Sequence, residues 1–143
     1  MENIIRVWIW VLCINQSGKI LYGLRKSKHG ENTYGPPGWH LEFWETIQAC
    51  AIRELFEESW IIVDEENVNI FCTLNDIYPN KEKHYISIIT TIKNITSIPI
   101  NKEPHKLESW QWMSWDEIKK LWDKNFLPMQ NFIKEYPDFS PLY

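Results

Sequence analysis

Three glutamates on one face of an expected helix constrain this chain more than any other feature. Glu54, Glu57 and Glu58 follow one another at helical spacing, which places them within roughly 100° of arc on a helix surface. Like charges at this spacing destabilise an isolated helix by about 0.2–0.5 kcal/mol per pair, and only Arg53 offers local relief. Because carboxylate oxygens suit hard divalent cations, we expect this face to bind Mg²⁺ or Mn²⁺.

A longer pattern surrounds this helix. Its charged positions are Glu45, Arg53, Glu54, Glu57 and Glu58. With bulky residues at Leu55 and Ile61, the pattern resembles the signature Gly-x5-Glu-x7-Arg-Glu-U-x-Glu-Glu-x-Gly-U of the Nudix, or MutT-like, pyrophosphohydrolases, where U is a bulky aliphatic residue. The two glycines of the signature are replaced by Trp39 and Trp60. The alternative is an ordinary acidic surface helix. That alternative does not explain why Glu45 stands at the spacing of the signature.

The resemblance implies the Nudix fold, which is an α/β/α sandwich with a mixed sheet and a loop–helix–loop box at residues 38–61. It covers nearly the whole chain, so we expect a single α/β domain over residues 1–143. Hydrophobic periodicity predicts strands near residues 4–14, 19–25, 68–77, 85–95 and 108–113. Helices are expected near residues 46–58, 115–122 and 126–136. Periodicity alone leaves the topology of the sheet open.

The resemblance also assigns roles to residues of the box. Glu57 and Glu58 correspond to the main metal ligands, and Glu54 to a further ligand or to the base that activates water. The carbonyl group of Gly38 corresponds to another ligand. In this mechanism water attacks a phosphorus atom of the substrate, and metal ions neutralise the negative charge that develops.

Other candidates for the site lie inside and outside the box. The resemblance implies that Arg53 orients the glutamates through an ion pair with Glu45. Weaker candidates for substrate or late metal contacts are Arg25, His40, Glu103, Glu108, Phe126 and Leu127. Each has an ordinary structural role as its alternative, such as a solvated hairpin end for Arg25 and plain packing for Phe126.

Three further stretches narrow the resemblance to one branch of the family. They are His40–Phe43, Glu108–Trp112 and Trp115–Glu117, which look like the nucleoside triphosphate diphosphatases. The leading interpretation is therefore an enzyme that cleaves nucleoside triphosphates to monophosphate and pyrophosphate. One alternative is a hydrolase of ADP-ribose or a nucleotide sugar. Another is a non-catalytic nucleotide-binding protein.

Composition limits the partners. The net charge of −4 gives no broad basic surface, so a nucleotide is expected as substrate rather than a nucleic acid polymer. The sequence shows neither a leader peptide nor an apolar run of about 18 residues, which favours a cytoplasmic protein without a membrane span. Cys13, Cys50 and Cys72 have neither metal-site nor paired spacing and are expected to be reduced. Oligomeric state is left open, with a homodimer as one alternative.

The balance of tryptophan and glycine is unusual. The chain has 9 Trp and 5 Gly, whereas average glycine usage predicts about ten glycines in a chain of this length. Five tryptophans stand where the resembled branch has glycine, namely Trp8, Trp10, Trp39, Trp44 and Trp60. Glycine permits positive φ or close backbone approach, and tryptophan permits neither at low cost. The other four, Trp110, Trp112, Trp115 and Trp122, raise no such conflict in the sequence.

We hypothesise that these five codons are UGA, which the source lineage reads as glycine and which is translated here as tryptophan. The gene sequence tests this, because UGG at all five positions would reject it. The alternative is a genuine tryptophan-rich variant with an occupied pocket. Since Trp8 and Trp10 project from one strand face that lies near the nucleotide in the resembled branch, we expect the tryptophan form to be marginally stable and weakly active.

Overall fold

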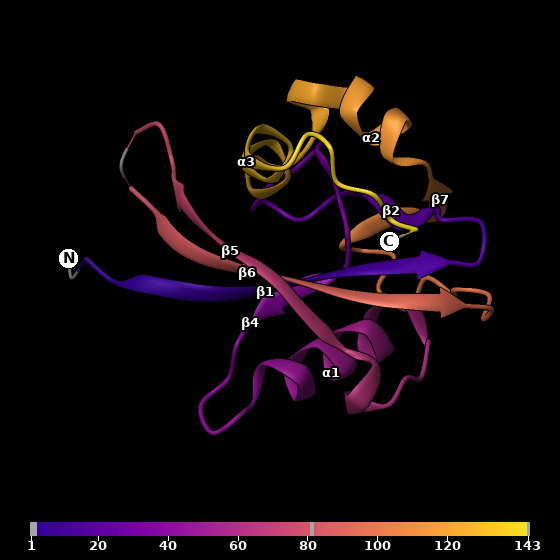
Figure 1. Cartoon of the computed structure of the whole chain (residues 1–143). Coiled ribbons are helices and arrows are strands. Elements are labelled where there is room, and N and C mark those ends of the chain that lie inside the picture. Colours follow the sequence, from indigo (N-terminus) through magenta and orange to yellow (C-terminus); the bar gives the residue numbers. More distant parts are fainter. Residues whose placement is uncertain (1–2, 81, 143) are drawn as a thin grey trace.

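A mixed sheet lies between helices on both faces in the computed structural model, which describes residues 3–80 and 82–142 (Figure 1). Helix α1 (Ile47–Ser59) covers one face, and α2 (Trp115–Leu121) and α3 (Leu127–Glu135) cover the other. The strands are β1 (Ile5–Asn15), β2 (Ile20–Arg25), β3 (Tyr34–Gly35), β4 (Gly38–His40), β5 (Asn69–Ile77), β6 (His84–Ile95) and β7 (Leu107–Met113). The predicted α/β/α sandwich is confirmed.

Strand β1 joins the two parts of the sheet. The main order is β3-β2-β1-β6-β5, with β4 paired to β1 and β7 paired to β2. Strands β1 and β6 are parallel, and the other pairs are antiparallel. Strand β1 therefore lies inside the sheet, with neighbouring strands along most of its length. Its alternating side chains contribute to both faces.

The side chains of β1 alternate between two hydrophobic clusters, as the period of a strand requires. Trp8, Trp10 and Leu12 enter the cluster beneath α2 and α3, which we call the aromatic cluster. Its other buried members include Tyr22, Tyr85, Trp115, Phe126, Phe132 and Phe139. Ile9 and Val11 enter the opposite cluster beneath α1, which we call the aliphatic cluster.

Helix α1 begins and ends at recognisable caps. The side chain of Thr46 accepts a hydrogen bond from the backbone N–H of Ala49, which satisfies one free donor of the first turn. At the other end Trp60 adopts φ 64° and ψ 9°, and its N–H donates to the carbonyl of Phe56. This left-handed cap is a position that glycine usually fills. Helix α2 begins with a capping box formed by Ser114 and Glu117.

Several elements differ from the sequence prediction. The short strands β3 and β4 and the 3₁₀ turns η1 (Glu65–Asn67) and η2 (Trp122–Lys124) were not expected. Trp122 follows α2 with φ 38° and ψ −99°, so the prediction that it raises no conflict is wrong. Only glycine tolerates this region well, because the side chain of any other residue clashes with the backbone.

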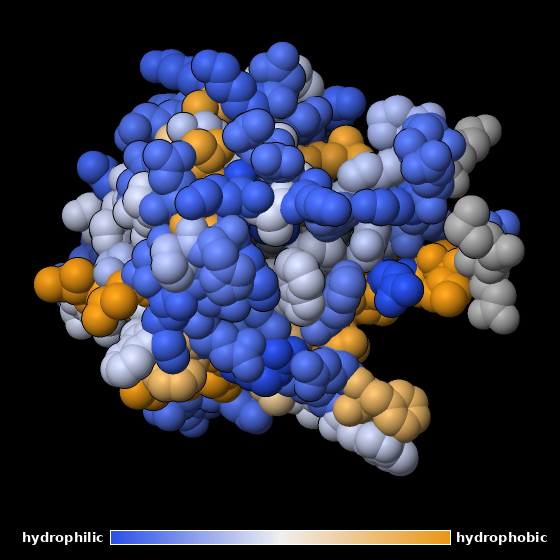
Figure 2. All heavy atoms as spheres, turned by 180° about the vertical axis from the view of Figure 1, so that it is seen from behind, coloured by the Kyte–Doolittle hydropathy of each residue, from blue (hydrophilic) through white to orange (hydrophobic). Residues whose placement is uncertain are grey.

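The surface is polar for the most part. Figure 2 shows one face that is mostly hydrophilic, with hydrophobic side chains in separate groups. Phe43 and Trp44 are the most exposed of the large apolar residues near the box, at 87% and 92% exposure, and their rings contact each other. Within residues 3–80 and 82–142, every helix is too short or too polar to cross a bilayer.

Candidate active site

Arg53 holds together the acidic side chains of the box. Its Nε and Nη2 atoms donate to the two carboxylate oxygens of Glu45 at 2.6 and 3.0 Å. Its Nη1 donates to Glu54 at 2.5 Å and to Glu57 at 3.3 Å. A planar guanidinium is suited to such bidentate contacts, whereas a lysine would offer a point charge. The structure thus brings together Glu45, Arg53, Glu54 and Glu57, while their roles in catalysis stay predictions.

Two glutamates of the helix, buried Glu54 and half-buried Glu58, have raised pKa values. Glu54 is 4% exposed, and burial raises its pKa to about 7 even though Arg53 opposes the shift. Burial also places the pKa of Glu58 well above its usual value, with a further contribution from Glu54. Arg25 and the backbone N–H of Gly38 act in the opposite direction. The two arginines therefore do not fully offset the cost of ionising both carboxyls at this face.

This imbalance bears on whether a divalent cation fits. Carboxylate oxygens with unmet charge are the donor set that Mg²⁺ and Mn²⁺ prefer. Among the described residues, no three His, Cys, Asp or Glu side chains are arranged so that they could hold an ion. Instead Arg53 draws Glu54 and Glu57 to itself. The residues fit a cation in their chemistry, and ligation requires the glutamates to exchange Arg53 for the ion.

Gly38 lies at the closest approach between the box and β1. A Cβ atom at this position would lie 2.4 Å from the carbonyl oxygen of Ile9, so only glycine fits. The backbone N–H of Gly38 donates to Glu58 at 3.0 Å. The predicted ligand role belongs to its carbonyl group and is not tested by this contact.

A small cleft opens beside Glu58. It is lined by Arg25, Ser27, Pro36, Trp39, Glu58, Asn101, Glu103, Lys106, Leu107 and Trp110. Glu103 forms an ion pair with Lys106 at 3.1 Å, and the Lys106 ammonium lies 4.9 Å from the centre of the Trp39 ring. The cleft therefore combines positive side chains with an aromatic wall next to the acidic helix.

Arg25 connects this cleft with the aromatic cluster. It is 7% exposed, so the expectation of a solvated hairpin end is wrong for this residue. Its guanidinium lies 4.6 Å from the ring centre of Phe126 and 5.7 Å from that of Trp10. Burial lowers the pKa of Arg25, and Glu58 opposes that shift. The side chain is thus positioned between an acid of the box and a set of aromatic rings.

The remaining predicted residues divide into two groups. Phe126 is buried beside Arg25, and His40 contacts Trp8 at 4.8 Å between ring centres, so both join the aromatic rings behind Arg25 without lining the cleft. Glu108 is exposed on β7 and does not line the cleft. Leu127 is half-buried at the start of α3 and does not line it either.

Trp8 and Trp10 fill the space beneath α3. They are 1% and 0% exposed, and their rings stack at 4.8 Å with 11° between the planes. The expectation that both project from one face of the strand agrees with the structure. His29 and Phe126 close the space from the other sides, at 5.1 and 6.1 Å from the Trp8 ring. The indoles thus occupy volume next to Arg25.

The other three anomalous tryptophans differ from one another. Trp44 and Trp60 have φ values of 68° and 64°, the left-handed region that favours glycine. Trp39 lies in β4, paired with Ile9 of β1, and its ring is half-buried in the cleft wall. At positions 44 and 60 the backbone has the positive φ that glycine adopts more easily than tryptophan. At positions 8 and 10 the backbone has no positive φ, and the conflict is the volume that the two buried indoles occupy.

A family model settles the relationship. The NUDIX domain model matches residues 5–134. The chain belongs to the NUDIX family. Its reaction class is hydrolysis of a pyrophosphate bond. The broad resemblance seen in the sequence is confirmed, although both glycines of the signature are absent.

Solved Nudix structures share this fold. The MutT protein from Methanosarcina mazei Go1 is 19% identical with a TM-score of 0.78, and the match covers 96% of each chain. A MutT NUDIX hydrolase from Burkholderia pseudomallei is 23% identical with a TM-score of 0.72, covering 80% of this chain and 87% of that one. At these identities the likeness establishes the fold alone.

A third structure is more similar in sequence but much longer. It is a bifunctional NMN adenylyltransferase/ADP ribose pyrophosphatase from Francisella tularensis, complexed with AMP and a Mn ion. It is 26% identical with a TM-score of 0.73, and the match covers 96% of this chain and 42% of that chain. Nearly the whole of this Nudix protein therefore matches less than half of the longer Francisella tularensis chain.

Several residues at the site were not predicted. Lys106, Asn101 and Trp110 line the cleft, and the indole N–H of Trp110 also donates to the carbonyl of Glu58 at 3.0 Å. His29 lies in the aromatic cluster, where burial lowers its pKa to about 4. No local pattern marks these residues, because long-range strand pairing and the loop after β6 bring them to the site.

Proposed function

We propose that this Nudix protein is a cytoplasmic, Mg²⁺-dependent (or Mn²⁺-dependent) hydrolase that cleaves nucleoside triphosphates to monophosphate and pyrophosphate. The observation that carries the proposal is the cluster of Glu54, Glu57 and Glu58 beside a cleft that contains Arg25 and Lys106. Acidic ligands for a cation and basic side chains for phosphate stand within one small region. A polyphosphate needs both.

The residues of the box would divide the work. Glu57 and Glu58, with Glu54 and the Gly38 carbonyl, would hold the cation, which would neutralise phosphate charge and orient the attacking water. Glu54 would accept the proton of that water. Arg53 would keep Glu54 and Glu57 in position through the pair that it forms with Glu45.

A second candidate is a hydrolase of ADP-ribose or another nucleoside diphosphate derivative. It is favoured by the likeness to the Francisella tularensis protein, a bifunctional NMN adenylyltransferase/ADP ribose pyrophosphatase. A third candidate, a nucleotide-binding protein without turnover, is favoured by the indoles of Trp8 and Trp10, which fill space beside the cleft.

One experiment separates the three. We define the glycine form as the protein with tryptophan replaced by glycine at positions 8, 10, 39, 44 and 60. Both forms would be incubated with Mg²⁺ and a panel of nucleoside triphosphates, ADP-ribose and nucleotide sugars, and the products identified. Release of pyrophosphate from triphosphates by the glycine form supports the proposal. Turnover of ADP-ribose alone would replace it with the second candidate, and binding without turnover with the third.

A further inference from the structure

An open hollow lies between the edge strand β5 and the segment that follows α3, and we call it the aromatic hollow. It has a volume of about 400 Å³, and its lining includes Phe71, Glu135, Tyr136, Asp138, Phe139 and Ser140. None of its lining residues also lines the cleft beside Glu58. The aromatic hollow is therefore separate from the candidate active site, and its volume is that of a site for a small molecule.

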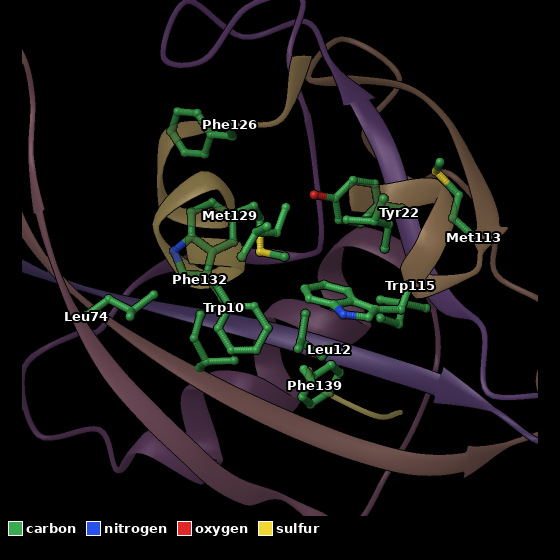
Figure 3. Packing of buried hydrophobic residues seen from close by; sticks show 14 of the residues in the cluster. Trp10, Leu12, Tyr22, Leu74, Met113, Trp115, Phe126, Met129, Phe132 and Phe139 are labelled. Carbon is green, nitrogen blue, oxygen red and sulfur yellow. The ribbon is translucent and has the colours of Figure 1, made fainter. Parts of the chain in front are cut away.

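A bulge in β5 brings the ring of Phe71 to this hollow. Residues 70 and 72 pair with successive residues of β6, so Phe71 is the extra residue between them. Cys72 packs against the aromatic cluster, so strict alternation would turn Phe71 to the opposite face. Instead its ring contacts Phe132 and Phe139, two members of that cluster (Figure 3). Bulges at sheet edges commonly redirect a side chain in this way, often beside a functional site.

The rings of the hollow stand at steep angles to one another. The ring centre of Phe71 lies 5.1 Å from that of Tyr136 with 70° between the planes, and 5.2 Å from that of Phe139 with 83°. Phe71 is 42% exposed, so this corner is open to solvent. Perpendicular rings cannot all stack on one flat ligand, but they can surround a rounded group and present their electron-rich faces to it.

The rim of the hollow is acidic. Glu135 and Asp138 are exposed at the rim, and neither has an ion-pair partner within residues 3–80 and 82–142. Among the described residues that line the hollow, none is a lysine, arginine or histidine. Uncompensated carboxylates next to aromatic rings favour a cationic ligand and disfavour an anion such as a nucleotide.

Other exposed aromatic rings of this protein already have a cation of the chain beside them. The Lys102 ammonium lies 4.4 Å from the ring centre of Trp60. Lys134 precedes Glu135 in α3, but its ammonium lies over Trp122 at 5.8 Å and not over the hollow. In the part of the chain that the structure describes, no cation lies over the rings of the hollow. This set of rings thus has a vacant place for a cation from outside.

We propose that the aromatic hollow binds a small methylated ammonium cation. The rings of Phe71, Tyr136 and Phe139 surround the methyl groups, over which a quaternary ammonium spreads its charge. Glu135 and Asp138 attract the cation from the rim. A primary ammonium is held more strongly by water and gains less from the rings. This second site does not depend on the proposed function.

The first test compares three ligands with the unaltered protein. Choline has a trimethylammonium group, 3,3-dimethylbutan-1-ol has the same shape without the charge, and ethanolamine has the charge without the methyl groups. We expect choline to bind at least about fivefold more tightly than either, measured by titration of the aromatic side-chain NMR signals. The signals that shift should include those of Phe71 and Tyr136. Equal binding of choline and 3,3-dimethylbutan-1-ol, or no saturable binding of choline, would overturn the proposal.

The second test locates the site with variants. Glu135→Gln combined with Asp138→Asn changes two exposed residues and should weaken choline binding about threefold or more. Glu65→Gln combined with Glu66→Gln in η1 changes the net charge by the same amount and should leave binding unchanged. Equal weakening by the two pairs would show a general effect of charge and reject the site.

The third test removes one ring. Phe71→Leu keeps an apolar side chain, and its thermal midpoint without ligand shows whether the variant is folded. In the folded variant the preference for choline over 3,3-dimethylbutan-1-ol should fall to about twofold or less. Retention of the full preference would show that the ring of Phe71 does not contact the cation and would overturn the proposal. The pair of acidic substitutions tests the site independently of this packing change.

Discussion

The two faces of the sheet are built from different materials and hold their polar groups in different ways. Beneath α1 the buried side chains are mostly aliphatic, and the charged groups lie at the rim, where Arg53 pairs with four carboxylates. Beneath α3 the buried side chains are mostly aromatic, and polar groups such as Asp76 and Ser87 lie inside. Charged groups thus lie at the edge of one face, and uncharged and acidic polar groups lie buried within the other.

The difference teaches where substitutions should act. A rim carboxylate is partly solvated or paired with an arginine, so its loss should affect the reaction more than the fold. A group within the aromatic face is packed on every side, so its loss should affect stability and binding together. The predictions below test this division, beginning with the largest effect.

The largest effect is expected for Glu58→Gln in the glycine form. The change removes a charge that is proposed to hold the cation, and several kcal/mol of charge stabilisation corresponds to a loss of about two to three orders of magnitude in turnover. The thermal midpoint should not fall, because burial and repulsion by Glu54 both disfavour the charged form of Glu58 in the folded state. Pyrophosphate release and calorimetry measure both. Glu66→Gln, an exposed acid in η1, is the matched control, and similar rates in the two variants would reject the assignment.

A smaller loss is expected for Arg53→Lys. The charge is kept, but the fork that binds both oxygens of Glu45 is lost. Groups that orient ligands in this way are typically worth about 10–100-fold in activity or metal affinity. Steady-state rates as a function of Mg²⁺ concentration measure the effect, with exposed Arg6→Lys as control. If Arg53→Lys has unchanged activity, the rim is not organised by this arginine.

The aromatic face should respond to pH through His29. Its pKa is lowered to about 4 by burial and by the nearby cations Lys83 and Arg25. Between about pH 6.5 and pH 4 the unfolded chain binds a proton that the folded chain does not, so the free energy of unfolding falls as pH falls through this window. Allowing for partial exposure, we expect about 1–2 kcal/mol. Urea unfolding across the window measures it, and His29→Gln should lose that part of the slope.

The smallest effect concerns Trp60, at the end of α1. Trp60→Gly relieves a left-handed backbone that tryptophan adopts at a cost and should raise the free energy of unfolding by about 1 kcal/mol. Trp112→Gly in β7 is the control, because it removes packing without relieving positive φ and should destabilise. Thermal and urea unfolding measure both. Equal destabilisation by the two changes would mean that strain at Trp60 is negligible.

The contrast between the faces also explains what the sequence could predict. The spacing of Arg53, Glu54 and Glu57 lies within one helix, so period alone places these groups together. The capping box at Ser114 is likewise local. By contrast, Ser87 meets Trp10 through pairing of strands 77 residues apart. No local pattern carries that register, so this buried hydrogen bond could not be anticipated.

Backbone conformation was the second property that the sequence predicted only in part. Position 60 was singled out because the resembled family has glycine there, and the left-handed φ of Trp60 agrees with that. The positive φ at Trp122, which has a different ψ, was not predicted, because α2 ends there in a 3₁₀ turn that no local sequence signal marks. Codon 122 should therefore be inspected together with the five positions already suspected.

The alternation of β1 makes this strand tolerant of substitution but intolerant of changes in length. A substitution in Trp8–Ile14 alters one cluster at a time, because neighbouring side chains point to opposite faces. Deletion of a single residue would reverse every side chain beyond it, placing indole rings against α1 and aliphatic groups beneath α3. Insertions and deletions in this segment should thus be absent from any functional version of the gene, however far its individual codons diverge.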